Sequence, residues 1–210
     1  VTAYEQLIAL YPEDSQGLGK ENFFPTVEHQ PMTYGLIVSA ESFRYRKTHG
    51  DESRRRIRKA VRWLLDNQDL DKDGLPGWGL PQAWDAFGDG TTNSVNQPYT
   101  ITSAIVLNGL LDSLTIKDFW SGAERDEMRS VMARVIVRWC RSLWSQGYTG
   151  GFFWYSPSPV DAIFAVNSPS MFMGSMARML HEQGDAFNAE ERALVQSRTD
   201  DMARAVISTV

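Results

Sequence analysis

The stretch from Val95 to Leu114, VNQPYTITSAIVLNGLLDSL, decides the fold. After Pro98 it contains one charged residue, Asp112, and its apolar residues recur on nearly every side of a helix. A helix that is apolar nearly all round is buried between neighbours. A proline at its start loses nothing, because the first N–H groups of a helix have no partner within it. We therefore expect a buried helix over residues 99–114.

The same pattern recurs along the chain. The residue pairs that lie 76 positions apart are Trp63 and Trp139, Gly74 and Gly150, Trp78 and Trp154, Pro81 and Pro157, and Asp85 and Asp161. At an offset of 71 the segment 95–98 matches 166–169, and at an offset of 67 the segment 29–31 matches 96–98. Each copy ends in a proline, followed by a charge-poor helix and then by an amphipathic helix that carries the basic residues. This periodicity predicts repeated helix hairpins.

The expected fold class is all-α. Helices are predicted over residues 3–11, 33–48, 52–67, 99–114, 123–146 and 169–183, and from Asn188 onwards, where Asn188 and Glu191 have the spacing of a capping box. No strand is expected. Charge-poor inner helices alternate with basic outer ones, so residues 1–210 form one domain of about three hairpins. The turns from inner to outer helices are short and the return loops are long, so the long loops should collect at one rim.

This arrangement resembles the α/α-toroid architecture, in which inner helices form a ring and a ligand binds at the loop rim. The turn from Asp71 to Gly79, DKDGLPGWG, is similar to turns in six-hairpin glycosidases and related polysaccharide-degrading or epimerising enzymes. The resemblance implies a toroid or partial toroid. A six-hairpin ring needs about 350 to 450 residues at this repeat length. We therefore expect either an open arc, or a ring that a further chain segment or a homo-oligomer completes.

Composition narrows the class of partner. The net charge of −5 and the pI near 5.2 argue against nucleic acid, which requires a basic face. No apolar run reaches the roughly 18 residues that span a bilayer, so we expect a soluble protein without a membrane span. Cys140 is the only cysteine, which excludes an intrachain disulfide and leaves the compartment open.

The expected function is a carbohydrate-active enzyme, either a hydrolase or a lyase, acting on a poly- or oligosaccharide at the rim. A glycosidase needs two carboxylates, and Glu28 with Asp85 or Asp89 is the available pair. In a lyase or epimerase, His29 or Tyr99 would remove the proton next to the substrate carboxylate.

Residues that differ between the copies are the best candidates for ligand contacts. His29, Asn96 and Asn167 occupy one repeat position, and either asparagine would help to neutralise a substrate carboxylate. The alternative role for these residues is a loop-to-helix cap. The predicted substrate-binding residues are Trp78, Trp84, Asp89, Asn96, Trp154, Tyr155 and Asn167.

Asp69, Asp71 and Asp73 resemble the first half of a calcium loop, in which alternate carboxylates face one cation. The twelfth position is Leu80 rather than Glu, so the segment is not an EF-hand, and Asp85 or Asp89 would supply the missing ligand. Ca²⁺ is the one candidate cofactor, and an Asp-rich turn is the alternative.

Two other functions remain open. One is a non-catalytic glycan-binding or scaffold domain of a longer protein, which a rim without a close pair of titratable groups would favour. The other is a terpenoid-cyclase-like toroid, which needs an apolar central cavity with an acid cluster, and the sequence has no Asp-x-Asp-Asp string.

Overall fold

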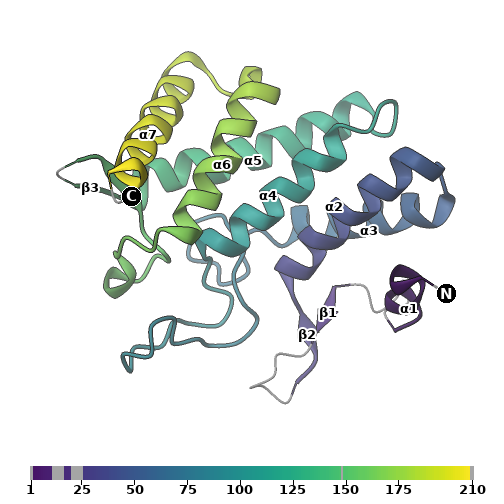
Figure 1. Ribbon diagram of the computed structural model, residues 1–210, viewed down its shortest axis with the longest axis horizontal. Helices are drawn as coiled ribbons and strands as arrows, with labels where there is room; N and C mark the ends of the chain where they lie inside the picture. The colour runs from purple at the N-terminus through teal and green to yellow at the C-terminus, as the bar shows by residue number, and fades with distance from the viewer. Residues whose placement is uncertain (1, 11–16, 20–25, 148, 209–210) are drawn as a thin grey trace.

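Three helix hairpins form the body of the protein (Figure 1). The computed structural model describes residues 2–10, 17–19, 26–147 and 149–208. The hairpins pair α2 (Pro31–Thr48) with α3 (Asp51–Asp66), α4 (Thr100–Leu114) with α5 (Gly122–Ser142), and α6 (Asn167–Glu182) with α7 (Ala189–Ile207). A short helix, α1 (Ala3–Leu10), precedes them. The predicted predominance of helices is confirmed.

The hairpins lie in two layers. Helix α4 packs between α2 and α6 in the inner layer, while α3 and α5 lie behind them in Figure 1 and α7 packs against α5 and α6. The hairpins lie side by side, and the described helices do not close into a ring. None of the described helices has both the length and the hydrophobicity that crossing a bilayer requires.

The inner helix α4 is buried as its composition predicts, with Leu107, Leu110 and Leu111 completely enclosed. Helices α2 and α4 approach closely where two glycines face each other. A Cβ atom added to Gly109 would lie 2.5 Å from the carbonyl oxygen of Gly35. The absence of a side chain at Gly109 therefore sets the spacing of the inner layer.

The predicted helix boundaries hold to within two residues, except in the fifth helix. The capping box of α7 is confirmed, since the Asn188 side chain accepts a hydrogen bond from the Glu191 N–H at 2.9 Å. The last predicted residue of the first helix, Tyr11, lies outside the described residues. The fifth helix was predicted to reach residue 146 but ends at Ser142.

The prediction of no strand was wrong. β1 (Leu18–Gly19) pairs antiparallel with β2 (Glu28–His29), with Leu18 opposite His29. β3 (Trp144–Gln146) pairs with β4 (Gly151–Phe153), with Trp144 opposite Phe153. Residues 144–146 were predicted to end the fifth helix, but they form β3 because their backbone pairs with that of β4. The described residues also form two short 3₁₀ turns, η2 (Pro159–Asp161) and η3 (Gly184–Ala186).

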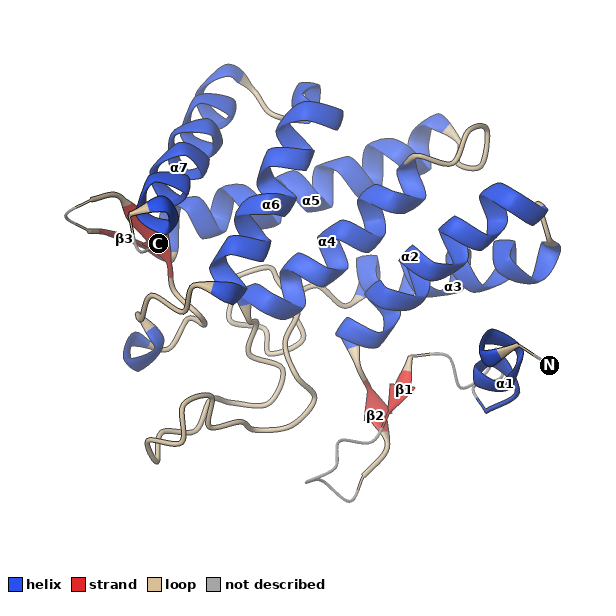
Figure 2. Cartoon of the chain, in the orientation of Figure 1, coloured by secondary structure: helices blue, strands red, loops and turns tan. Residues whose placement is uncertain are grey.

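The long loops gather at one rim, as predicted. Residues 67–99 and 154–166 lead into the next inner helix and lie at the lower edge of Figure 2, on the same side as β1 and β2, whereas the hairpin of β3 lies at the left beside α7. The turns from inner to outer helices, at 49–50, 115–121 and 183–188, are short and lie at the opposite edge. The rim therefore combines the starts of the three inner helices with most of the non-helical chain.

Candidate functional site

A buried carboxylate fastens the two long rim loops together. Asp161, in η2, is 1% exposed, and its Oδ2 accepts hydrogen bonds of 2.6 Å from both Asn93 Nδ2 and Ser156 Oγ. Gln97 Nε2 donates to Ser156 Oγ at 3.3 Å and extends the network. Asn93 belongs to the first loop, and Ser156 and Asp161 belong to the second. The polar contacts thus fix one loop against the other.

A pocket of about 430 Å³ opens between these loops. Its lining consists of Asp71, Asp73, Thr92, Asn93, Ser94, Gln97, Pro157 and Ser158. All but Pro157 carry hydrogen-bonding groups. A pocket of hydroxyl, amide and carboxylate groups matches the hydrogen-bonding groups of a sugar.

The three aspartates predicted to bind a cation come together at this pocket. One carboxylate oxygen from each of Asp69, Asp71 and Asp73 lies within 4.8 Å of the other two. Partial burial, followed by the charge of Asp73, raises the pKa of Asp71 to about 6. Asp73 Oδ1 accepts a hydrogen bond of 2.7 Å from the Leu75 N–H. Crowded oxygen ligands of this kind fit a hard cation such as Ca²⁺.

Asp85 and Asp89 shape a surface turn beside the pocket. The Asp85 carboxylate accepts backbone N–H groups from four residues, 87 to 90. These bonds, the one from Gly90 foremost, hold the pKa of Asp85 below its usual range. Asp89 Oδ1 accepts from the backbone and the hydroxyl of Thr91. Both carboxylates thus have a local structural function.

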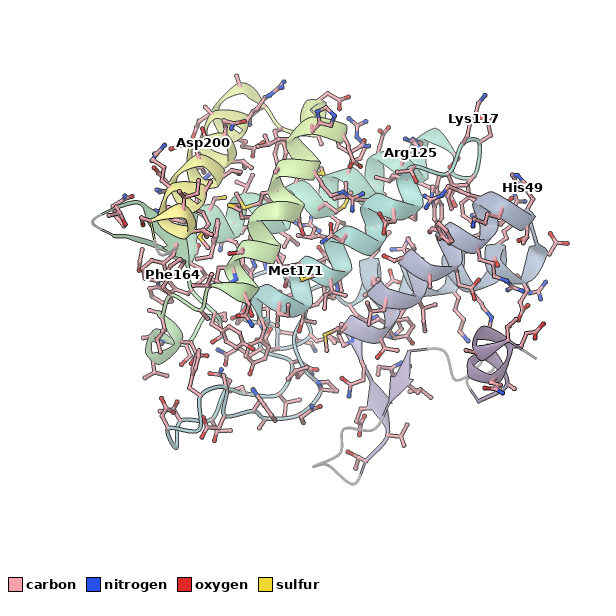
Figure 3. The ribbon with its side chains drawn as sticks, in the orientation of Figure 1. His49, Lys117, Arg125, Phe164, Met171 and Asp200 are labelled. Carbon is pink, nitrogen blue, oxygen red and sulfur yellow. The ribbon has the colours of Figure 1, made fainter. Side chains whose placement is uncertain are left out.

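Aromatic side chains lie over the junction of the two loops. Trp84 pairs with Asn93 through two backbone hydrogen bonds. The ring of Phe87, which is 41% exposed, contacts Tyr155 edge-on at 5.3 Å, and Tyr155 also contacts Tyr99 at 5.5 Å. Phe164, labelled in Figure 3, packs against Phe152 further along the second loop.

Tyr99 is buried beneath these rings. Only 1% of it is exposed, and burial raises its pKa to about 12. Burial also raises the pKa of Tyr155, with the Asp161 charge contributing. A phenol with a raised pKa stays protonated at neutral pH and is a poor base. Tyr99 therefore does not suit the proton abstraction predicted for it.

His29 lies in an aromatic stack away from the acidic residues. Its Nδ1 is 2.7 Å from the Tyr34 hydroxyl, and its ring stacks on Tyr34 and on Trp63 with centroid distances of 5.8 and 5.2 Å. The neighbouring Glu28 is exposed at the end of β2. The pairing of Glu28 with Asp85 or Asp89 stays a prediction, and the Asp85 carboxylate is bound by the backbone of its own turn.

Four of the predicted substrate-binding residues make contacts within the protein or shape its backbone. Trp78 is 1% exposed, and its Nε1 donates to the Leu64 carbonyl, so both faces of its ring are covered by the core and none is left for a sugar. Trp154 packs against the core and donates to Ser145 Oγ at 2.8 Å. Asn96 has a positive φ of 64° in the loop. Asn167 is the first residue of α6 and accepts a hydrogen bond from the Ser168 N–H, but the N-cap position is Val166, so the capping role given as its alternative is not what the structure has.

Sequence reasoning missed Asn93, Ser156 and Gln97 and treated Asp161 only as the copy of Asp85. The two aspartates occupy matching sequence positions but different environments: one is in a surface turn and the other is buried between loops. The repeat was the only signal that pointed to Asp161.

Comparisons of the chain with protein-family models, with curated proteins and with solved structures found no match. The chemistry of the rim has to be inferred from its own residues.

Proposed function

We propose that the chain is a carbohydrate-active hydrolase that cleaves a poly- or oligosaccharide in the rim pocket. The observation that carries the proposal is the pairing of Asp71 and Asp73 in a pocket whose other groups are mostly hydroxyls and amides. A glycosidase needs one protonated and one ionised carboxyl group beside the bond that breaks.

Asp71 is the proton donor in this proposal. Its pKa of about 6 keeps a substantial fraction protonated near neutral pH, as general acid catalysis requires. Asp73 is the second carboxylate, held in place by the Leu75 N–H. Their spacing, within 4.8 Å, is closer to the roughly 5 Å of retaining enzymes than to the larger separation of inverting ones. We expect retention of configuration.

Other rim residues favour hydrolysis over proton abstraction. His29 is engaged with Tyr34, and Tyr99 is buried with a raised pKa. The contact with Tyr34 uses only Nδ1 of His29, and the buried Tyr99 phenol is a poor base, so we give the two aspartates the catalytic role. The exposed ring of Phe87 beside Tyr155 offers a surface on which a sugar ring can pack.

The α/α-toroid remains part of the proposal. Three hairpins with their long loops at one rim are the arrangement that a segment of such a ring would have. Further hairpins, from another chain segment or a second copy, would complete it. The polar lining of the rim pocket gives no support to a terpenoid cyclase, which needs an apolar cavity.

A second candidate is a non-catalytic glycan-binding domain that uses Ca²⁺. It is supported by the oxygen ligands of Asp69, Asp71 and Asp73, which would hold the cation at the edge of the pocket, where sugar hydroxyls could complete its coordination. The two candidates exclude each other at Asp71, because a carboxylate bound to a cation cannot donate a proton.

The test is a panel of polysaccharides assayed for new reducing ends and, separately, for the absorbance of unsaturated uronates. We expect reducing ends alone, lost by at least a hundredfold in Asp71→Asn. Asp66→Asn, which removes an exposed carboxylate on α3, is the matched control and should keep full activity.

Other outcomes point elsewhere. Unsaturated products would identify a lyase. Glycan binding without cleavage, abolished by EDTA and restored by Ca²⁺, would identify the second candidate. A loss of activity in Glu28→Gln or His29→Ala, with Asp71→Asn unaffected, would show that the catalytic residues lie on β2 and not in the rim pocket.

A further inference from the structure

We propose that a groove along α5 binds an acidic helical segment of a partner protein. The groove has a volume of about 490 Å³ and is bordered by η3 and the start of α7. It shares no lining residue with the rim pocket, so it is independent of the proposed function.

The groove follows one face of the helix. Its lining residues on α5 run from Asp126 to Arg141, a length of about 22 Å at the rise of an α-helix. Ala133 and Val137 are buried at its centre, and their short side chains leave room between the arginines around them. Arg134, Arg138 and Arg141 have the spacing that places residues on the same side of a helix. The groove is long enough for about four helical turns.

The carboxylates of the groove are already engaged. Asp126 and Asp185 both pair with Arg129. Glu191 accepts the Asn188 N–H in the capping box of α7. These acidic groups therefore leave the remaining arginines of the groove without strong partners.

Three arginines of the groove make no strong ion pair. Arg134 donates to Gln68 Oε1, which is neutral. Arg141 lies 3.4 Å from Glu190, a side chain that is 87% exposed, and such surface pairs contribute little. Arg138 makes no hydrogen bond or ion pair with any described residue. The lining holds four arginines and three carboxylates, a net charge of +1, and it is the row of Arg134, Arg138 and Arg141 along α5 that points to an anionic ligand.

The spacing of the charges points to a helix. Carboxylates at positions i, i+4 and i+7 of a partner helix would rise by about 6 and 4.5 Å, as the three arginines do. Each guanidinium can hold a carboxylate through two parallel hydrogen bonds. A uniform polyanion fits less well, because Asp126 and Glu191 would repel it at the borders of the groove. A protein segment can place neutral or basic residues there.

The test uses a fluorescently labelled helical peptide with glutamates at i, i+4 and i+7, and its glutamine analogue, measured by fluorescence anisotropy. We expect the acidic peptide to bind, and binding to weaken as salt is added. Arg138→Gln/Arg141→Gln should weaken it at least tenfold. Lys117→Gln/Arg204→Gln removes the same charge at exposed sites outside the groove and should have little effect (Lys117 is labelled in Figure 3). Circular dichroism checks that both variants fold.

Several results would overturn the proposal. They are no binding, equal binding of the glutamine analogue, insensitivity to salt, or the same loss in both double variants. Stronger binding of polygalacturonate or single-stranded DNA than of the acidic peptide, lost in Arg138→Gln/Arg141→Gln, would assign the groove to an anionic polymer instead.

Discussion

Asp161 holds more of the rim together than any other single side chain described above. Removing its carboxylate would leave Asn93 and Ser156 without their acceptor in a buried site. Hydrogen bonds to a charged group contribute roughly 1.5–3 kcal/mol each, and unsatisfied buried groups add a penalty. We predict that Asp161→Ala lowers the free energy of unfolding by about 2–4 kcal/mol, measured by urea denaturation.

The control for that measurement is Asp200→Ala. Asp200 is exposed on α7 (Figure 3), and its loss should change stability by less than about 0.5 kcal/mol. Equal stability of the two variants would mean that Asp161 does not fasten the loops.

The raised pKa of Asp71 predicts how the free energy of unfolding depends on pH. Its pKa is about 6 in the folded protein and about 3.9 in an unfolded chain, so the folded state retains a proton that the unfolded state loses between these values. The free energy of unfolding should therefore fall as the pH rises from about 4 to about 6. Solvent screens this partly exposed group, so we expect an effect of about 1–2 kcal/mol.

The measurement is urea denaturation across this range for the parent and for Asp71→Asn, in buffer without divalent cations. The difference between the two profiles isolates Asp71 from other carboxylates. Addition of Ca²⁺ distinguishes the two proposed functions: a cation bound at the cluster would abolish the difference in slope, whereas a proton donor would keep it. A parent profile as flat as that of Asp71→Asn would contradict the raised pKa.

At the scale of single residues, the sequence predicts groups of chain neighbours better than contacts between residues that are far apart in the chain. The cluster of Asp69, Asp71 and Asp73 was predictable because its members are neighbours in the chain. The bonds of Asp161 were not, because Asn93 lies 68 residues away and reaches it only after both loops fold. Trp78 was misplaced for a related reason, since a tryptophan in a loop can turn inwards when a backbone carbonyl accepts its N–H.

At the scale of elements, two glycines within inner helices allow a matched experiment. Alanine at Gly109 would push its Cβ against the carbonyl oxygen of Gly35, whereas alanine at Gly174 meets no atom within 4 Å. We predict that Gly109→Ala destabilises the protein by about 1–3 kcal/mol through overpacking. Gly174→Ala should stabilise it by about 0.5–1 kcal/mol, because alanine is the better helix former.

Thermal unfolding of both variants measures the two effects. The substitutions are chemically identical, so helix propensity alone predicts stabilisation in each. A rise in melting temperature for Gly109→Ala would show that α2 and α4 are not in the close contact described.

The elements themselves were largely predictable, because long apolar and amphipathic patterns determine helices locally. The C-terminal end of α5 and the four short strands among the described residues were not. Trp144 and its neighbours continue a helical pattern in sequence, yet they pair with Gly151–Phe153. Strands of two or three residues are too short to show the alternation by which strands are recognised.

For the whole molecule, the arrangement of the hairpins predicts a gradient of stability. Each hairpin packs only against its neighbours, as in a repeat protein. Helix α4 is covered on both sides by α2 and α6, whereas the outer hairpins each have one free edge. We predict that amide hydrogens exchange most slowly in α4 and faster in α3 and α7.

Hydrogen exchange with mass spectrometry, in low urea, measures this gradient. Uniform exchange across all helices would mean that the three hairpins unfold as one cooperative unit. The hairpin order was predictable from the repeat, because each copy supplies one charge-poor and one amphipathic helix.

The helices are joined by short turns at one edge and by long loops at the other. This difference in length determines where the protein tolerates insertions, in evolution or in engineering. An extra residue in the turn at 49–50 would rotate α3 relative to α2 and disturb the packing of these two helices. Extra residues in the segment 86–91 would alter the Asp85 turn and the position of Phe87, but they would disturb no contact between helices. The edge with the short turns therefore tolerates few insertions, whereas the rim loops tolerate more. New binding specificities can be introduced at the rim without redesigning the helices.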